Sequence, residues 1–187
     1  DKFLQNNFGE IDTLDPTKEL PKISALLITR NEERNIQKFL DEAWYADEIV
    51  IVDSESTDST AEIAKKHPKV RFIVRKFDNF TAQKNFAIDQ AKNEWVTFFD
   101  ADERIPKALI FEMLDEIEKD EADAFFVYRR FFFMDKYVKY SGWQNDKVIR
   151  LFKKSKNRYG EGRLVHELID SKGSVKHLQN RLDHYSY

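Results

Sequence analysis

Three acidic residues, Asp100, Asp102 and Glu103, fall within four positions at the end of a hydrophobic run, in the stretch VTFFDADERI. Like charges placed so close repel one another, so we expect a cation to lie among them. Carboxylate oxygens are the ligands that hard divalent ions prefer, often together with substrate phosphates. Asp100 and Asp102 are therefore candidate ligands of Mg²⁺ or Mn²⁺.

Two other hydrophobic runs also end in polar residues. ISALLIT leads into Thr29, Arg30 and Glu32, and EIVIVD ends at Asp53 and leads into a serine-rich turn. In open α/β sheets, ligands bind beyond the carboxyl ends of the strands. One such loop alone is more often a helix cap or a solvated turn, but three on one rim favour a binding site.

Glycine is absent from all of these strand-to-helix turns. The sequence has five glycines, and they are Gly9, Gly142, Gly160, Gly162 and Gly173. Neither a GxGxxG fingerprint nor a P-loop is present, so backbone amides of a glycine loop would not neutralise a bound diphosphate. A divalent cation on Asp100 and Asp102 would serve instead.

The elements that position these residues alternate between strands and helices. Residues 23–29, 48–53, 70–75 and 95–100 predict strands, and helix-like segments follow each of them, with Ser59 and Thr81 as expected N-caps. This alternation predicts an α/β fold with a mainly parallel sheet. After residue 122, the runs AFFVYRRFFF and VIRLFKK predict antiparallel additions at the sheet edge.

Composition limits the classes of protein. The 187 residues suit one domain, which we place at 23–187 after an irregular lead-in at 1–22, with further chain expected beyond the C-terminus. Lys and Arg number 31 against 34 Asp and Glu, and the net charge of −3 argues against nucleic-acid binding. The absence of cysteine fits a cytoplasmic protein, and no apolar run approaches the roughly 18 residues of a membrane span.

Four segments, LLITRNEERNI, EIVIVDSESTDST, QKNFAI and FFDADERI, occur in an order and at intervals that resemble family 2 glycosyltransferases of the GT-A fold. The later segments GWQNDKVIRLFKK, GRLVHE and LDHYSY resemble the bacterial lipopolysaccharide core β-glycosyltransferases. A lone DxD is a weak signal, whereas this ordered set is specific. The resemblance implies a donor-binding half at 23–121 and an acceptor-side half at 122–187.

The resemblance also implies roles for individual residues. The residues implied to hold a nucleoside-diphosphate sugar are Thr29, Arg30, Glu32, Asp53, Lys84 and Asp100. Asp100 and Asp102 align with the family's DxD, whose second aspartate contacts the metal directly, and His184 is implied as a further metal or diphosphate contact. The alternatives are that Lys84 is a solvated helix residue and that His184 is a hydrogen-bonded structural histidine.

The family inverts the anomeric centre by a single displacement, in which an acceptor hydroxyl attacks and the nucleoside diphosphate leaves. A carboxylate base is needed opposite the leaving group. Glu167 is our first choice, because it follows two glycines in a predicted loop beyond the acceptor segment, and Asp146 is the second. The VHE sequence around Glu167 departs from the family's usual acidic pair. Trp143 is the candidate residue for stacking against an acceptor sugar.

The implied partners are a nucleoside-diphosphate sugar and a saccharide or glycolipid acceptor, with peripheral contact at the cytoplasmic face of the inner membrane.

Three other functions compete with sugar transfer. A nucleotidyltransferase would need a glycine-rich first turn, which is absent. A phosphoryl-accepting receiver domain would not explain the aromatic region after residue 122. A non-catalytic module that only binds a sugar nucleotide or a metal stays open.

Overall fold

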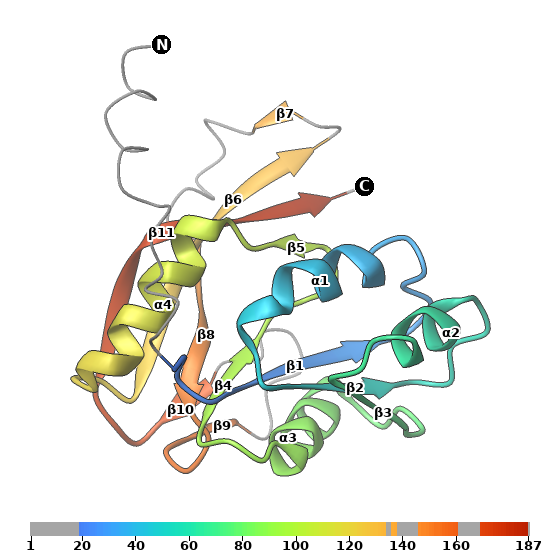
Figure 1. The fold of residues 1–187 in the computed structure, drawn as a ribbon, viewed down its shortest axis with the longest axis horizontal. Helices are drawn as coiled ribbons and strands as arrows, with labels where there is room; N and C mark the ends of the chain where they lie inside the picture. The colour runs from blue at the N-terminus through green and yellow to red at the C-terminus, as the bar shows by residue number, and fades with distance from the viewer. Residues whose placement is uncertain (1–18, 134–135, 138–145, 161–168, 187) are drawn as a thin grey trace.

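A computed structural model describes residues 19–133, 136–137, 146–160 and 169–186 of the chain. The predicted α/β fold is confirmed: one curled sheet carries helices on both faces (Figure 1). Of the predicted irregular lead-in, residues 19–22 are described and contain no helix or strand, and the remainder lies outside the described residues.

The first half of the sheet is parallel. Its strands are β1 (Ile23–Thr29), β2 (Glu48–Asp53), β3 (Val70–Val74) and β4 (Trp95–Phe98), in the spatial order β3-β2-β1-β4. β1 pairs in parallel with β2 on one side and with β4 on the other. The carboxyl ends of β1, β2 and β4 therefore lie on one rim, as the polar loops of the sequence predicted.

Strands β1 and β2 are buried on both faces, which explains their continuous hydrophobic sequences. Leu27 and Ile51 face a core that includes helix α1 (Ile36–Glu42), helix α2 (Thr60–Lys65) and helix α4 (Lys107–Lys119). Leu26 and Val50 face a second core with helix α3 (Phe80–Gln90). A short 3₁₀ helix, η1 (Ala43–Tyr45), follows α1 directly.

Helix α2 is capped differently from the prediction. The side chain of Ser59 makes no capping hydrogen bond. Asp58 Oδ1 instead accepts hydrogen bonds from the Thr60 amide at 3.0 Å and from its hydroxyl at 2.5 Å. Ser59 occupies the predicted N-cap position, but the predicted capping bond from its side chain was wrong, because the preceding aspartate satisfies the free helix amide.

Helix α3 begins before Thr81, so the prediction of that residue as its cap was also wrong. The helix starts at Phe80, and Asn79 Oδ1 accepts a hydrogen bond from the Ala82 amide at 2.8 Å. Asparagine is among the preferred N-cap residues, so the sequence held the signal two residues earlier than expected.

The second half of the sheet adds the predicted antiparallel strands. Its strands are β5 (Glu103–Arg104), β6 (Ala124–Phe133), β7 (Lys136–Tyr137), β8 (Lys147–Lys153) and β11 (Val175–Ser186). β8 is antiparallel to both β4 and β6, whereas β11 runs parallel to β6 and then pairs antiparallel with β5. A separate two-stranded sheet joins β9 (Asn157–Tyr159) to β10 (Ile169–Ser171).

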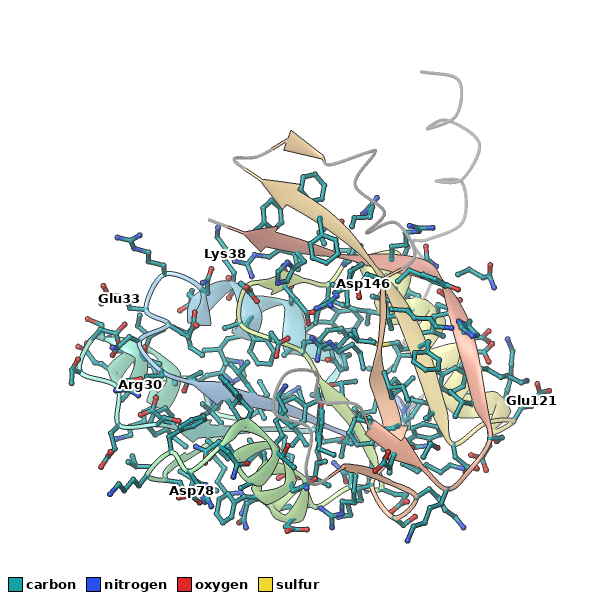
Figure 2. The ribbon with its side chains drawn as sticks, turned by 180° about the vertical axis from the view of Figure 1, so that it is seen from behind. Arg30, Glu33, Lys38, Asp78, Glu121 and Asp146 are labelled. Atoms are coloured by element: carbon teal, nitrogen blue, oxygen red, sulfur yellow. The ribbon has the colours of Figure 1, made fainter. Side chains whose placement is uncertain are left out.

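The surface of the described residues is strongly charged. Glu33 and Lys38 of the parallel half and Glu121 beyond α4 are exposed and extend from the ribbon (Figure 2). None of the helices among the described residues is long and apolar enough to cross a membrane.

Candidate active site

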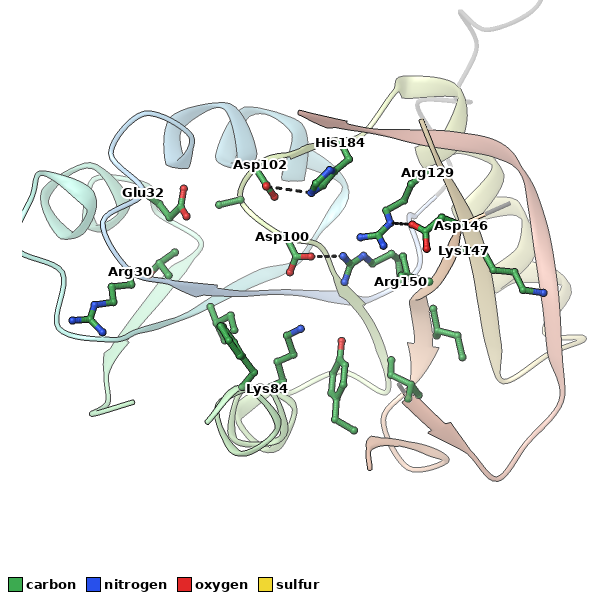
Figure 3. Close-up of a pocket in the computed structure, with 18 of the residues that line it drawn as sticks. Arg30, Glu32, Lys84, Asp100, Asp102, Arg129, Asp146, Lys147, Arg150 and His184 are labelled. Carbon is green, nitrogen blue, oxygen red and sulfur yellow. Dashed lines mark hydrogen bonds and ion pairs between the residues drawn. The ribbon is translucent and has the colours of Figure 1, made fainter. Parts of the chain in front are cut away.

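A pocket of about 1080 Å³ opens at the carboxyl ends of β1, β2 and β4, and strands β6, β8 and β11 close its other side (Figure 3). Arg30 lies toward one end and Asp146 toward the other. The polar residues that line the pocket are Thr29, Arg30, Glu32, Ser54, Lys84, Asp100, Asp102, Arg129, Asp146, Lys147, Arg150, Tyr159 and His184. Both halves of the sheet therefore contribute to one site.

Asp53 supports the pocket from behind and is not one of its lining residues. Its buried carboxylate accepts hydrogen bonds from the Thr29 hydroxyl at 2.8 Å, the Ser56 amide at 2.8 Å and the Ser56 hydroxyl at 2.5 Å. These bonds tie the turn after β1 to the turn after β2, because Thr29 and Asp53 are register partners.

The same two turns contain left-handed backbone without glycine. Asn31 has φ 57° and Glu55 has φ 56°. Asparagine adopts this region readily, but glutamate does so at a cost of roughly 1–3 kcal/mol. Hydrogen bonds of Asn31 across the two turns offset part of this conformational cost. The Asn31 amide donates to Ser56 Oγ at 2.8 Å, and Asn31 Oδ1 accepts from the Thr57 amide at 2.8 Å.

Glu32 belongs to the turn after β1, and the turn that contains Asp100 and Asp102 lies near it (Figure 3). Its amide donates to Thr60 Oγ1 at 2.7 Å, and its Oε2 accepts from Asn35 Nδ2 at 3.0 Å. Burial raises the pKa of its carboxyl, and the nearby charge of Asp102 acts in the same direction. A hydrogen-bond donor or a cation in the pocket would stabilise the ionised carboxylate of Glu32 and so oppose the effect of burial.

Lys84 projects from α3 into the pocket and points toward Asp100 (Figure 3). Its ammonium nitrogen lies 5.1 Å from the ring centre of Tyr159 and 6.0 Å from those of Phe80 and Phe98. The ammonium group lies beside these three rings, and its positive charge faces the pocket. This charge helps to hold the pKa of Asp100 low.

The cation that the acidic run predicted at Asp100 and Glu103 is an arginine of the chain itself. Arg150 donates hydrogen bonds from Nη2 to Glu103 Oε1 at 2.6 Å and to Asp100 Oδ2. Burial would raise the pKa of Asp100, but the positive charges of Arg150 and Lys84 outweigh it and hold that pKa below its ordinary value. Burial does raise the pKa of Glu103, against the opposing charge of Arg150.

Asp102 and His184 meet although they lie far apart in the sequence. His184 Nε2 is 3.3 Å from Asp102 Oδ2, and the Tyr185 amide donates to the Asp102 carbonyl at 3.3 Å. The contact with Asp102 raises the pKa of His184, although burial opposes it. An oxygen and an imidazole nitrogen at this separation fit two positions around a divalent ion.

The metal ligands that the sequence predicted are thus brought into one pocket but not into one cluster. Asp100 is turned toward Arg150, while Asp102 is turned toward His184. Among the described residues, no group of three or more His, Cys, Asp or Glu side chains could hold a metal ion. Within the described part of the chain, Asp102 and His184 would supply two ligands of such a cation, and the phosphates of a bound molecule could supply others.

The candidate bases and the acceptor residue are only partly described. Asp146 lines the pocket, and its Oδ2 accepts a hydrogen bond from Arg129 Nε at 2.5 Å. Glu167 and Trp143 lie outside the described residues.

Sequence reasoning gave no role to Arg150. The signal available for Arg150 was an arginine between Ile149 and Leu151, in the hydrophobic centre of a predicted strand. Arginine is almost never fully buried unless it is paired, so its place in such a run predicts a buried acid nearby.

The chain matches the family model described as Glycosyl transferase family 2 over residues 24–172. It is 34% identical over 164 residues to the lipopolysaccharide core biosynthesis glycosyltransferase LpsC of Rhizobium meliloti (strain 1021), an alignment covering 83% of this chain and 60% of LpsC. It is 41% identical over 98 residues to an uncharacterized glycosyltransferase of Rickettsia bellii (strain RML369-C), covering 52% of this chain and 32% of that protein. The chain therefore spans 60% or less of the length of these two relatives.

Among solved structures, S. aureus TarS 1-349 has a TM-score of 0.65 at 17% identity, covering 89% of this chain and 60% of that one. The same protein in complex with UDP has a TM-score of 0.64, covering 89% and 61%. At this identity the likeness shows the fold alone, which is the GT-A-like fold that the sequence predicted. The extent of the family match shows more: this chain belongs to glycosyl transferase family 2.

Proposed function

We propose that the protein is a metal-dependent inverting glycosyltransferase. It would move a sugar from a nucleoside-diphosphate sugar to a hydroxyl of a cell-envelope glycan or glycolipid. The observation that carries this proposal is the meeting, in one pocket, of the turns after β1 and β2, Lys84, and the Asp102–His184 pair. Together they offer polar contacts for a nucleotide and opposite charge for its phosphates.

The nucleotide would occupy the end of the pocket formed by Thr29, Arg30 and Glu32, with Asp53 holding that wall in place. Lys84 would face the diphosphate, and Asp100 would accept a hydrogen bond from a donor hydroxyl. The complex of TarS with UDP supports uridine as the first nucleotide to test.

Asp102 and His184 would hold Mg²⁺ or Mn²⁺, with the donor's phosphates as further ligands. When bound, such an ion neutralises the negative charge that grows on the leaving diphosphate. Lys84 adds a second positive charge on the opposite wall. Because no glycine loop is present, this end of the pocket depends on side-chain and metal charge rather than on backbone amides.

The acceptor would approach from the side of β6 and β8. Its hydroxyl oxygen attacks the anomeric carbon, a carboxylate takes the hydroxyl proton, and the bond to the diphosphate oxygen breaks. Glu167 is proposed as this base and Asp146 as the second candidate, with Trp143 stacking on the acceptor sugar. The name of LpsC supports a lipopolysaccharide-type acceptor, reached at the cytoplasmic face of the inner membrane.

The test is a thermal-shift panel of UDP, GDP and CDP on the full-length protein, with Mn²⁺, with Mg²⁺ and in EDTA. A ligand at about 100 times its Kd stabilises the folded state by about 2.7 kcal/mol. We expect one nucleotide to do so only with a divalent ion. Equal stabilisation in EDTA would remove the metal from the proposal, and no stabilisation by any nucleotide would remove the donor.

A second measurement separates an enzyme from a module that only binds the donor. UDP release from UDP-sugars should occur in the presence of Mn²⁺ and rise when a saccharide or glycolipid acceptor is added. Tight binding of UDP with no release under any condition would favour the non-catalytic alternative.

A further inference from the structure

Arg150 has an unusual place for a charged residue. It lies in the middle of β8, its side chain is only 4% exposed, and it still lines the pocket. Its Nε atom is buried and has no hydrogen-bond partner among the residues that the structure describes. A buried arginine of this kind carries a desolvation cost that a purely structural role seldom recovers.

The strands are irregular at this residue. β8 pairs with β6 through Ile149 and Leu151, but their partners, Phe126 and Phe125, are adjacent, so Arg150 is the extra residue of a bulge. On its other side, β8 pairs with β4 only as far as Thr97, which faces Leu151. Bulges commonly redirect a side chain beside an active site. Here the side chain is directed at the turn that follows β4.

Arg150 and Glu103 hold Asp100 from two directions. Arg150 Nη2 bonds to the carboxylate of Asp100 and, at 2.6 Å, to Glu103 Oε1. Glu103 Oε2 accepts a hydrogen bond from the Asp100 amide at 2.9 Å. Both the backbone and the side chain of Asp100 are therefore fixed by one buried acid–base pair.

The two residues of the DxD turn differ in this respect. Asp102 is held through its carbonyl by the Tyr185 amide, and its carboxylate meets only the imidazole of His184 among the contacts seen in the described residues. The side chain of Asp100 is 35% exposed and lines the pocket, while its carboxylate is also bonded to Arg150. That arrangement suits a group that must present an oxygen to a ligand in one orientation.

We propose that Arg150 and Glu103 are positioning residues that fix Asp100 to receive a hydroxyl of the donor nucleotide. This rests on the proposed function, because it takes the donor to be a nucleoside diphosphate bound in this pocket. Neither residue is assigned contact with the reacting atoms. Their removal should weaken donor binding while the metal contacts of Asp102 and His184 remain.

The first variant is Arg150→Met in the full-length protein, with UDP as the probe in the presence of Mn²⁺. Loss of a residue that orients a ligand-binding group typically costs about 10- to 100-fold, so the Kd for UDP should rise by about that factor. In turnover with a UDP-sugar, donor KM should rise more than kcat falls. The melting temperature should also fall, because Glu103 is left buried without its partner.

The double variant Glu103→Gln/Arg150→Met separates positioning from stability. It leaves no uncompensated buried charge, so the melting temperature should recover by at least half of the loss. The Kd for UDP should not recover, because Asp100 still lacks its arginine. This variant also carries the test if Arg150→Met alone fails to fold.

A matched control lies at the far end of the same sheet. Arg71 of β3 donates to the Gln90 carbonyl and lies 4.0 Å from the largely buried Glu48. Arg71→Met should lower the melting temperature and leave the Kd for UDP unchanged. This control shows that loss of stability alone does not weaken UDP binding.

Three results overturn the inference while leaving the proposed function intact. They are UDP binding by Arg150→Met or the double variant within twofold of the wild type, recovery of UDP binding in the double variant, and a double variant that does not fold. If the wild type itself binds no nucleoside diphosphate, the proposed function fails first.

Discussion

The two halves of the sheet hold their pocket residues on different parts of the backbone. The parallel half contributes acids and hydroxyls from the ends of its strands and from the turns that follow them, among them Thr29, Glu32 and Asp100. The other half contributes Arg129 and Arg150 from within strands β6 and β8. Asp100 therefore sits on a turn, whereas the arginine that neutralises it sits within a strand, at a bulge.

The difference shows in how each acid is held. Glu32 is bonded by an amide side chain, and burial raises the pKa of its carboxyl. Asp100 is half-buried, and the charge of Arg150 holds its pKa below the ordinary value against the effect of burial. Neutral hydrogen bonds fix the shape of a turn, whereas a strand-borne arginine also fixes the charge of the acid it contacts.

Loss of Asp102, the turn acid whose carboxylate contacts His184, should have the largest effect. We expect Asp102→Ala to abolish sugar transfer, because the proposed metal site loses its only carboxylate, while the melting temperature stays near that of the wild type. The assay is release of nucleoside diphosphate together with a thermal melt. Asp115→Ala, at an exposed acid of α4, is the control and should retain activity. Transfer by Asp102→Ala at the control's rate would contradict the metal assignment.

The second comparison is between the two candidate bases. Glu167→Gln should lower kcat by roughly 10²- to 10⁴-fold with donor affinity unchanged, the range typical of a general base. Asp146→Asn should lower it less, because the Asp146 carboxylate is already engaged by Arg129. Both variants are measured in the same transfer assay with the native acceptor. Full activity of Glu167→Gln beside an inactive Asp146→Asn would reverse the assignment.

Neutral hydrogen bonds in the parallel half should contribute to the free energy of unfolding but little to the binding of the donor nucleotide. Asn79→Ala removes the cap of α3 and should lower the free energy of unfolding by about 1 kcal/mol. Ser59→Ala is the matched control, since Ser59 caps α2 in position but makes no side-chain bond. Urea denaturation of both variants is the measurement. An equal loss in the two would mean that the Asn79 bond contributes nothing.

The smallest effect concerns Glu42, an acid whose carboxylate is held by a backbone amide. Burial raises the pKa of Glu42 above its ordinary 4.5, and its Oε2 accepts from the Ile105 amide at 2.7 Å. Because the folded state holds the proton more tightly, its contribution to stability is present below pH 4.5 and is lost as the pH rises through the folded pKa.

Glu42→Gln cannot titrate, so it should gain stability relative to the wild type between pH 4 and pH 7. Melting temperatures of both proteins at the two pH values test this. Asp41→Asn, at the exposed neighbouring position, should show no such gain. A relative loss for Glu42→Gln at pH 7 would mean that the ionised carboxylate strengthens the bond to Ile105 by more than burial costs.

Much of this arrangement could be predicted from sequence because it depends on local pattern. Continuous hydrophobic runs located the parallel strands, and polar residues at their ends located the rim. The pairing of Arg150 with Asp100 could not be predicted, because it depends on a bulge in β8 and on which strand lies beside β4. The caps at Asp58 and Asn79 were missed for a smaller reason, since several polar residues in succession compete for the same amides.

Strand β11 gives the site a late step in folding. Of the described strands it comes last in the chain, yet it fills the gap between β6 and β5 and brings His184 beside Asp102 (Figure 1). Its Leu178 and Leu182 also complete the core beneath α4. Contacts so distant in sequence form slowly, because a long loop must close first. During synthesis, the donor pocket can therefore assemble only after residue 184 has left the ribosome, and until then β6 presents an unpaired edge.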